Sequence, residues 1–227
     1  MENIFIHQHL GLGDHIVCNG LIREICKSNN NYYLAVKNNN FDSVEYMFRD
    51  IKNLKCIRVV DGENSEIDAS NQCLKLNCKL LKIGHEFFIS SCRFDQSFYK
   101  QLGIDFQKRW DSFYFERDYE KEKKFFNSLN LPNKYIFINE DVERKVFLTR
   151  IENKKDFHYR SNKHLTKNIF DYIKVLENAE EIHLMESSFL FICDSLNLKG
   201  KLYIHRYARY IPPNFYPSLK NNWTILT

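Results

Sequence analysis

The sequence predicts an α/β protein built from two successive units, each with a parallel sheet flanked by helices. Strand-like apolar runs alternate with amphipathic helical patterns in both halves of the chain, and short connections join them. The alternation starts afresh after a junction near residues 116–132. The chain has 227 residues, enough for two small domains of about 110 residues each. We therefore expect one domain at residues 1–117 and a second at 118–227.

The first half begins with an apolar run that predicts a strand and with a glycine-containing turn that leads into a helix. Apolar residues recur at helical spacing in that helix, at Cys18, Leu21, Ile22 and Ile25. Asp42 is the expected N-cap of the following helix, and the polar run 61–77 is expected to be a loop. The strands expected in this half are 1–6, 32–36, 56–60, 79–83 and 87–90, and its later helices cover residues 41–51 and 96–102.

The second half opens with a charged helical stretch from Tyr119. Glu120 and Lys124 are spaced to pair along its solvated face, and Pro132 ends it. The strands expected beyond it are 135–138, 181–185, 201–204 and 223–226, and the helices are 168–179 and 189–196. Neither half contains a repeat of fixed period or a low-complexity tract.

The composition is that of a folded globular protein. Hydrophobic residues make up 44% of the chain and aromatic residues 15%, so a packed core can form and an intrinsically disordered chain is excluded. The mean hydropathy is −0.49, and no apolar run approaches the length of about 18 residues that a membrane-spanning helix needs. The first residues show no signal or transit peptide, so we expect a cytoplasmic protein.

Charge and cysteine content narrow the classes of partner. The net charge is +4, and the basic residues are spread along the chain rather than concentrated as in nucleic-acid-binding domains. This mild excess suits a phosphate-bearing small molecule or a peripheral position on an anionic membrane. The seven cysteines form no CxxC pair, which argues against a disulfide scaffold or a zinc ribbon and for a reducing compartment.

The turn after the first strand holds the first candidate site. Gly11 and Gly13 allow a sharp turn and the close approach of a ligand, and the helix start beyond them offers free N–H groups. A dinucleotide fingerprint would have a third glycine where this chain has Ile16, and the Asp14 carboxylate would repel a pyrophosphate. The helix dipole favours an ionised Asp14, which suits it to accept a proton from a hydroxyl. Its alternative role is to be the N-cap of the helix.

The GLGD turn and the helical sequence IVCNGLIR that follows it resemble the start of the heptosyltransferase-like glycosyltransferases of family 9. The resemblance implies the GT-B fold, in which two Rossmann-like domains with parallel sheets face each other across a cleft. It implies an N-terminal domain on the acceptor side and a C-terminal domain that binds the nucleotide-sugar donor. In that family the aspartate of this turn is the catalytic base, which here is Asp14.

Glu186, Ser187 and Ser188 provide a second match, just before the helix that carries Phe189. They are similar to the acid–small–small turn by which these transferases hold the donor diphosphate. Ser187 and Ser188 would offer hydroxyl and N–H groups to phosphate oxygens, and Glu186 would contact the ribose or the sugar. The family has Asp-Ser/Thr-Gly at this place, so the match is partial. A capping turn is the alternative for Ser187.

Arg144 provides the third match, because the loop after the first strand of the C-terminal domain often supplies a basic residue to the diphosphate in GT-B transferases. Lys145 stands beside it. A guanidinium can grip phosphate oxygens with two hydrogen bonds and offset the charge of the leaving group. A solvated loop of mixed charge is the alternative.

Other residues are weaker candidates for the cleft, with a basic strand end or a hydrogen-bonded core histidine as the alternative. They are His9, His15, Arg206 and Arg209, together with the turn residues Gly11 and Gly13, and beyond them His7, Arg109, Lys163 and His164.

Together the matches imply a metal-independent, inverting glycosyltransferase. It would move a hexosyl, deoxyhexosyl or heptosyl group from a nucleoside-diphosphate sugar to a hydroxyl of a glycan or glycolipid. Asp14 would deprotonate that hydroxyl, and fixed N–H groups and arginine would stand in for a cation, so neither a metal nor a cofactor is expected. No nucleic-acid partner is expected.

Two other functions stay open. The chain can be a non-catalytic module that binds a nucleotide or a glycan with the same fold, or an NAD-linked Rossmann enzyme, which Asp14 and Ile16 disfavour. An Asp14→Asn variant separates the first alternative from an enzyme, because it should keep donor binding and lose turnover only if Asp14 is the base.

Overall fold

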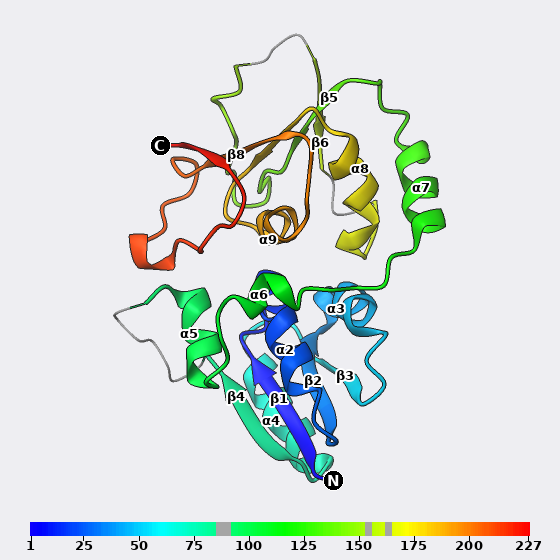
Figure 1. Ribbon diagram of the computed structural model, residues 1–227, viewed down its shortest axis with the longest axis vertical. Helices are drawn as coiled ribbons and strands as arrows, with labels where there is room; N and C mark the ends of the chain where they lie inside the picture. The colour runs from blue at the N-terminus through cyan, green and yellow to red at the C-terminus, as the bar shows by residue number, and fades with distance from the viewer. Residues whose placement is uncertain (85–91, 153–155, 162–164) are drawn as a thin grey trace. The chain divides into compact units, whose positions relative to one another are not determined.

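The computed structural model describes residues 1–84, 92–152, 156–161 and 165–227. The chain forms two compact units, Met1–Glu116 and Arg117–Thr227 (Figure 1). The expected boundary, after residue 117, differs from this division by one residue. Each unit has its own parallel sheet with helices packed on it, so the predicted α/β class is confirmed. The strand expected at 87–90 and the candidates Lys163 and His164 lie outside the described residues.

The sheet of the first unit has the strand order β3-β2-β1-β4, and every pairing is parallel. Ile6 in the central strand lies opposite Leu34 on one side and Leu81 on the other. Phe5, Ile6 and Leu34 are fully buried, as expected for a sheet covered on both faces. The strands are β1 (Asn3–Gln8), β2 (Asn31–Lys37), β3 (Leu54–Val59) and β4 (Lys79–Ile83).

Helices cover both faces of this sheet. In Figure 1, α2 lies in front of β1 while α4 lies on the other side of the sheet, where Ala69 and Cys73 pack against Phe5 and Ala35. The helices are α1 (Leu12–Val17), α2 (Asn19–Ile25), α3 (Phe41–Phe48), α4 (Ser65–Lys75), α5 (Phe94–Gln101) and α6 (Lys108–Asp111), with a 3-10 turn at Asn38–Asn40.

Two helix boundaries differ from the prediction. The first helix is interrupted at Cys18, which is both the C-cap of α1 and the residue before α2. Asp42 is not the N-cap of α3; Asn40 is, because a 3-10 turn leads directly into the helix. Asp42 lies in the first turn instead, where its negative charge still favours the positive end of the helix dipole.

The largest difference from the prediction concerns residues 61–77. The sequence predicts a loop there, whereas the structure has helix α4. Its buried stripe consists of Ser65, Ala69 and Cys73, spaced four residues apart. These side chains are too small and too polar to produce a clear apolar period, so the polar exposed face dominated the pattern. Asp68 ties the helix to β3 by accepting the Val60 N–H at 2.8 Å.

The sheet of the second unit has the order β6-β5-β7-β8-β9, again with every pairing parallel. The edge strand β6 was not predicted, because Phe157 is exposed and the strand has no buried apolar run. The strands are β5 (Tyr135–Ile138), β6 (Phe157–Arg160), β7 (Glu181–Leu184), β8 (Lys201–His205) and β9 (Trp223–Leu226).

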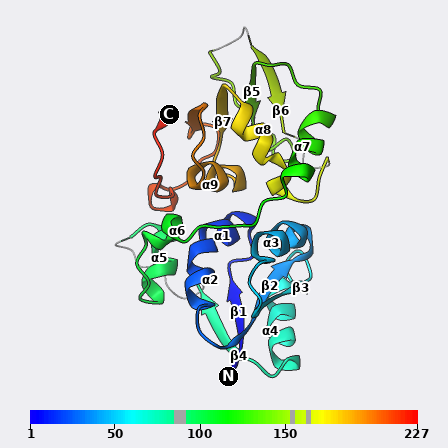
Figure 2. The same cartoon turned by 45° about the vertical axis from the view of Figure 1, so that its right-hand side comes forward.

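The helices of the second unit include a pair that lies side by side, α7 and α8 (Figure 2). Phe125 of α7 meets Tyr172 edge-on, with 4.8 Å between the ring centroids. The helix expected at 168–179 begins as a 3-10 turn, because the Asn168 side chain accepts the Phe170 N–H at 3.1 Å. The helical segments are α7 (Tyr119–Ser128), a 3-10 turn at Ile169–Tyr172, α8 (Ile173–Asn178), α9 (Ser188–Ser195) and a 3-10 turn at Pro213–Phe215.

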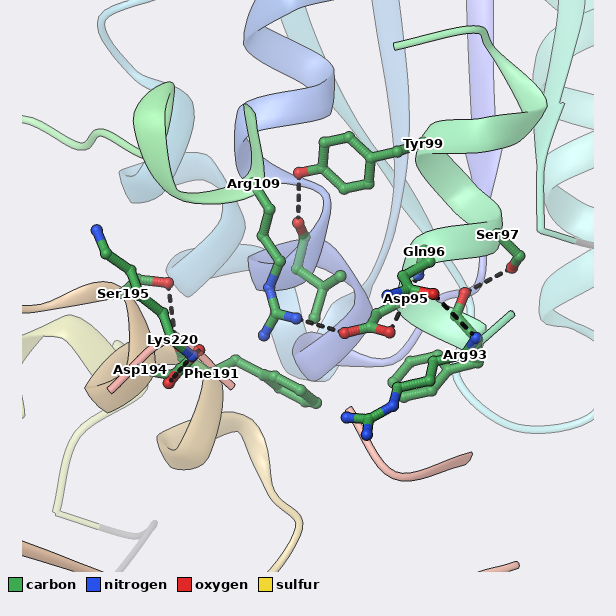
Figure 3. Close-up of polar contacts among 12 residues, drawn as sticks. Arg93, Asp95, Gln96, Ser97, Tyr99, Arg109, Phe191, Asp194, Ser195 and Lys220 are labelled. Carbon is green, nitrogen blue, oxygen red and sulfur yellow. Dashed lines mark hydrogen bonds and ion pairs between the residues drawn. The ribbon is translucent and has the colours of Figure 1, made fainter. Parts of the chain in front are cut away.

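Asp194, at the end of α9, fastens the chain that enters the last strand. It accepts the N–H groups of Lys220 and Asn221 and, at 2.9 Å, the indole N–H of Trp223. Figure 3 shows the bond from Lys220. Because Asp194 is fully buried, these donors supply the stabilisation that water would otherwise give its charge. The parallel order and this clamp place the loops after β5, β7 and β8 at one edge of the sheet.

Candidate functional site

The turn after β1 carries Asp14 at the third residue of α1. Gly11 is the N-cap, in extended backbone, and its carbonyl accepts the His15 N–H at 3.2 Å. The Asp14 carboxylate turns back and accepts the Gly11 N–H. This is the acidic half of a capping box, in which the side chain of the third helical residue accepts the backbone N–H of the N-cap. Asp14 is therefore not itself the N-cap.

Glycine at position 11 is required by the closeness of that carboxylate. A Cβ atom at Gly11 would lie 2.6 Å from Asp14 Oδ2, closer than real Cβ contacts. The absence of a side chain at Gly11 therefore leaves space for the Asp14 carboxylate above the backbone.

Burial raises the pKa of Asp14 to about 6, against the opposing effects of His9 and of the Gly11 N–H. At neutral pH the carboxylate is therefore ionised, and its basicity is close to the value that suits a general base near pH 7. His9 is exposed and meets Phe98 edge-on at 5.5 Å between ring centroids. Gly84, at φ 88°, leaves room for both rings.

His15 lies inside the first unit. It is fully buried, and its Nδ1 is hydrogen-bonded to the side-chain amide of Gln8, the last residue of β1. Burial lowers its pKa to about 3, so the ring stays neutral. Its function in this structure is to connect α1 to the end of β1.

A buried ion pair that the sequence did not reveal lies in the same unit. Arg109 donates from Nη1 to Asp95 Oδ2, and both side chains are almost completely buried (Figure 3). The pKa of the Cys18 thiol is raised by its burial and next by the charge of Asp14, while Arg109 opposes the rise. Asp14 and the ion pair therefore act on the same thiol. Residues 14 positions apart on two different helices carry no sequence signal of such a pair.

Glu186 and Ser187 form the corresponding turn in the second unit, between β7 and α9. Ser187 is the N-cap of α9, but its side chain makes no capping hydrogen bond. Its Oγ and both carboxylate oxygens of Glu186 are buried and have no hydrogen-bond partner among the described residues. The first amides of the helix, Ser188 and Phe189, have no intrahelical acceptor either. Buried polar atoms without a hydrogen bond are rare in proteins, and three of those in the described residues lie at this helix start.

Two arginines lie beside this helix start. Arg206 Nε is 3.6 Å from Glu186 Oε1, and Arg209 Nη1 donates to the Glu186 carbonyl at 3.5 Å. The Arg206 guanidinium also lies 4.0 Å from the centroid of the Tyr216 ring. Burial raises the pKa of Glu186, and the two arginines oppose that rise. Of the predicted residues, the structure thus brings Glu186, Ser187, Arg206 and Arg209 together.

Arg144 and Lys145 lie in a tight hairpin that follows β5. The hairpin is closed by two backbone bonds between Asp141 and Val146, with Lys145 at φ 56°. The Arg144 side chain is 67% exposed and pairs with Asp141 at 3.3 Å. No contact among the described residues joins Arg144 to Glu186 or Ser187. Among the described residues, Arg206 and Arg209 are the basic residues shown beside the start of α9. Their position directly after β8, the strand that pairs with β7, was the signal in the sequence.

Clusters of metal ligands and membrane-spanning helices are both absent from the described ranges. Within them, no three side chains of histidine, cysteine, aspartate or glutamate come together as ligands for a metal ion. No helix there is both long and apolar enough to span a bilayer. All seven cysteines are free thiols.

Comparison with solved structures identifies a protein of the same fold. The crystal structure of a glycosyl transferase of family 9 from Veillonella parvula DSM 2008 is similar to 99% of this chain and to 85% of its own, with a TM-score of 0.61 and 11% sequence identity. No family model matches the chain, and no curated protein sequence is significantly similar to it. The predicted GT-B-like, family 9-like fold is thereby confirmed. At this identity the similarity concerns the fold alone.

Proposed function

We propose that this protein, which has the fold of a family 9 glycosyltransferase, transfers a sugar from a nucleoside-diphosphate donor to a hydroxyl group of a glycan or glycolipid. The second unit would bind the donor, and Asp14 of the first unit would be the general base. The transfer would invert the configuration at the anomeric carbon, because the deprotonated hydroxyl attacks from the face opposite the leaving diphosphate.

The observation that carries the proposal is the start of α9, where the buried Ser187 hydroxyl has no hydrogen bond among the described residues and two arginines lie beside Glu186. A diphosphate would accept hydrogen bonds from the amides of Ser188 and Phe189 and from the Ser187 hydroxyl. The Glu186 carboxylate is an acceptor, so it suits the hydroxyl groups of a ribose or a sugar rather than a phosphate. Arg206 and Arg209 would offset the negative charge that grows on the leaving diphosphate.

Asp14 supports the catalytic half of the proposal. Its carboxylate is held by the Gly11 N–H, and its pKa of about 6 leaves it charged and ready to accept a proton at neutral pH. His9 and Gly13 border the same turn and would line the acceptor side. Charge stabilisation by fixed N–H groups and arginines does not require a metal ion, so we propose that the reaction is metal-independent.

Arg144 and Lys145 remain proposed donor ligands of lower rank. In this structure the Arg144 side chain is engaged by Asp141, so it would have to leave that carboxylate to reach a phosphate. We propose that it supplements Arg206 and Arg209.

The alternatives are a binding module of the same fold and an NAD-linked enzyme. A module would keep the site at α9 and need no base, so the perturbed pKa of Asp14 favours an enzyme. For NAD, the pyrophosphate would have to lie at the GLGD turn, where the Asp14 carboxylate already accepts the Gly11 N–H. We further propose a cytoplasmic protein, with a peripheral membrane contact if the acceptor is a glycolipid.

The proposal is tested by thermal denaturation with a panel of nucleoside diphosphates, their sugars and NAD. A nucleoside diphosphate should stabilise the protein by about 2.7 kcal/mol at a hundredfold excess over its Kd. The matched nucleoside should stabilise it far less, because it lacks the phosphates. Stabilisation by NAD and by no nucleoside diphosphate would overturn the proposed donor class. A nucleotide sugar that binds without any transfer to glycan acceptors would favour the module.

A further inference from the structure

A continuous chain of hydrogen-bonded side chains runs along β7 and β8 in the second unit. Glu181 Oε2 lies 3.2 Å from His183 Nε2, and His183 Nδ1 lies 2.8 Å from His205 Nε2. His205 Nδ1 in turn lies 2.9 Å from the hydroxyl of Tyr207. Both histidines are buried, and the mechanism proposed above uses neither. The chain reaches from the amino end of β7 to the loop that follows β8.

The Tyr207 hydroxyl fixes the direction of every proton in this chain. It accepts the backbone N–H groups of Thr149 at 2.9 Å and Arg150 at 2.8 Å. These two bonds use its two lone pairs, so its own hydrogen is left to be donated. His205 Nδ1 lies 2.9 Å away and Thr149 Oγ1 3.5 Å away, and the shorter distance assigns the hydrogen to His205 Nδ1.

The same reasoning assigns the tautomers of the two histidines. His205 accepts at Nδ1, so its hydrogen is on Nε2 and is donated to His183 Nδ1. His183 then carries its hydrogen on Nε2 and donates it to the Glu181 carboxylate. Both rings must be neutral for this pattern. Burial lowers the pKa of His183, and it lowers the pKa of His205 to about 4, which agrees with neutral rings.

Tyr207 belongs to the loop that carries the two arginines of the candidate site. Arg206 precedes it and Arg209 follows it by two residues, and both contact Glu186. Ala208 packs against an apolar cluster composed of Ile136, Ile138, Leu148, Ile151 and Met185. The Arg150 guanidinium lies 4.5 Å from the centroid of the Tyr207 ring. The Tyr207 hydroxyl therefore joins the arginine loop to the segment after β5, through the backbone N–H groups of Thr149 and Arg150. This connection does not depend on a charged side chain.

We propose that Tyr207 is a positioning residue, whose hydroxyl, oriented by His205 and His183, holds the Arg206–Arg209 loop beside Glu186 at the start of α9. The consequence for anion binding rests on the proposed function, whereas the connection of the two loops does not. Tyr207 itself would touch no substrate.

Tyr207→Phe tests the proposal, because it removes the hydroxyl and keeps the ring beneath Arg150. We expect the amides of Thr149 and Arg150 to exchange with deuterium at least tenfold faster. The affinity for inorganic pyrophosphate, a probe that carries the diphosphate and no base, should fall about fivefold by calorimetry. Tyr203→Phe is the matched control, since Tyr203 lies on β8, just before the Tyr207 loop, and stacks on His183 through its ring. It should leave both measurements unchanged.

A measurement on the unmodified protein guards against a variant that misfolds. Nitrogen-15 NMR should find both His183 and His205 neutral and protonated on Nε2. A hydrogen on His205 Nδ1, or unchanged exchange at Thr149 and Arg150 in Tyr207→Phe, would overturn the proposal. If the unmodified protein binds no pyrophosphate, the proposed donor site falls, while the exchange and tautomer results still decide whether Tyr207 connects the loops.

Discussion

The two units contain the same local motif, a buried parallel strand that turns into a helix beside an acidic residue, and they use it in opposite ways. After β1 the acid is Asp14, inside the helix, and its carboxylate accepts the amide of Gly11. After β7 the acid is Glu186, before the helix, and its Oε1 lies 3.6 Å from Arg206 Nε rather than on an amide of the helix. At the first helix start the carboxylate accepts the N-cap amide, whereas at the second it faces an arginine.

The difference shows how one position decides whether a helix start receives an anion or presents a base. An acid at the third helical residue accepts the amide of the N-cap and disfavours a phosphate by its charge. An acid placed before the N-cap leaves the first amides of the helix free, and Arg206 and Arg209 add positive charge beside them. We therefore propose proton transfer at the first turn and donor binding at the second.

The largest effect is expected from Asp14→Asn. The amide cannot accept a proton, so turnover should fall about 100- to 10,000-fold, the range that general acid–base catalysis supplies. The Kd of the nucleoside diphosphate should stay within twofold, because the second turn is untouched. Steady-state kinetics and calorimetry on the same preparation give both values. Equal turnover by the two proteins would remove Asp14 from the mechanism.

The same substitution should stabilise the fold at neutral pH. The folded-state pKa of Asp14 is about 6, above its ordinary value of 3.8, so ionising the folded protein costs free energy as the pH rises through 6. A shift of about two pKa units corresponds to at most about 3 kcal/mol. Asp14→Asn should therefore raise Tm at pH 7.5 and have little effect at pH 4. A difference in Tm that does not change with pH would contradict the raised pKa.

Removing the two arginines of the second turn should weaken donor binding. Charge-assisted hydrogen bonds contribute about 1.5–3 kcal/mol each, so Arg206→Ala should weaken the nucleoside diphosphate about 30-fold, and Arg209→Ala somewhat less. Arg58→Ala is a matched control, because it removes the same charge from the first unit, where Arg58 pairs with Asp42 at 3.5 Å. Arg144→Ala, measured in the same way, gives the contribution of the hairpin arginine to the affinity for the nucleoside diphosphate. Equal losses in Arg58→Ala and Arg206→Ala would reduce the effect to net charge.

The pH dependence of turnover should report the first turn. As the proposed base, Asp14 would act when ionised, so kcat/KM should be constant above pH 7 and fall up to tenfold per pH unit below about pH 6. His9→Gln removes the neighbouring positive charge that holds the pKa of Asp14 down, so it should move the acid limb to higher pH. If the acid limb of kcat/KM lies at the same pH in His9→Gln as in the unmodified protein, His9 is excluded as a neighbour of the base.

The smallest effect is expected from Ser187→Ala. It removes one hydroxyl and leaves the helix amides, so the affinity for a nucleoside diphosphate should fall about fivefold, close to the 1 kcal/mol of a single neutral hydrogen bond. Because the hydroxyl makes no capping bond, Tm should hardly change. A large loss of Tm with unchanged affinity would make Ser187 a structural cap instead.

The sequence predicted those parts of the fold that have strong apolar periods. The buried runs of β1, β5 and β7 and the apolar face of α9 were found because large side chains recur at strand or helix spacing. Helix α4 and strand β6 were missed, since α4 buries small residues and β6 lies at the edge of its sheet.

The site was predictable where local sequence determines the geometry. Gly11 and Asp14 are three residues apart, and Glu186 and Ser187 are adjacent, so both turns could be predicted from the sequence. The ion pair of Asp95 with Arg109 depends on how separate helices pack, which no local pattern encodes. For the same reason the choice of Arg206 over Arg144 as the neighbour of Glu186 required the strand order β5-β7-β8.

The most direct measurement is a titration of the nitrogen-15-labelled protein with the nucleoside diphosphate that stabilises it most, followed through individual amide resonances. We expect large downfield shifts at Ser188 and Phe189, where phosphate oxygens would accept the free N–H groups, and small ones at Gly11 and Gly13. Large shifts at Gly11 and Gly13 with none at the start of α9 would contradict it, because the phosphates would then lie at the turn assigned to the base.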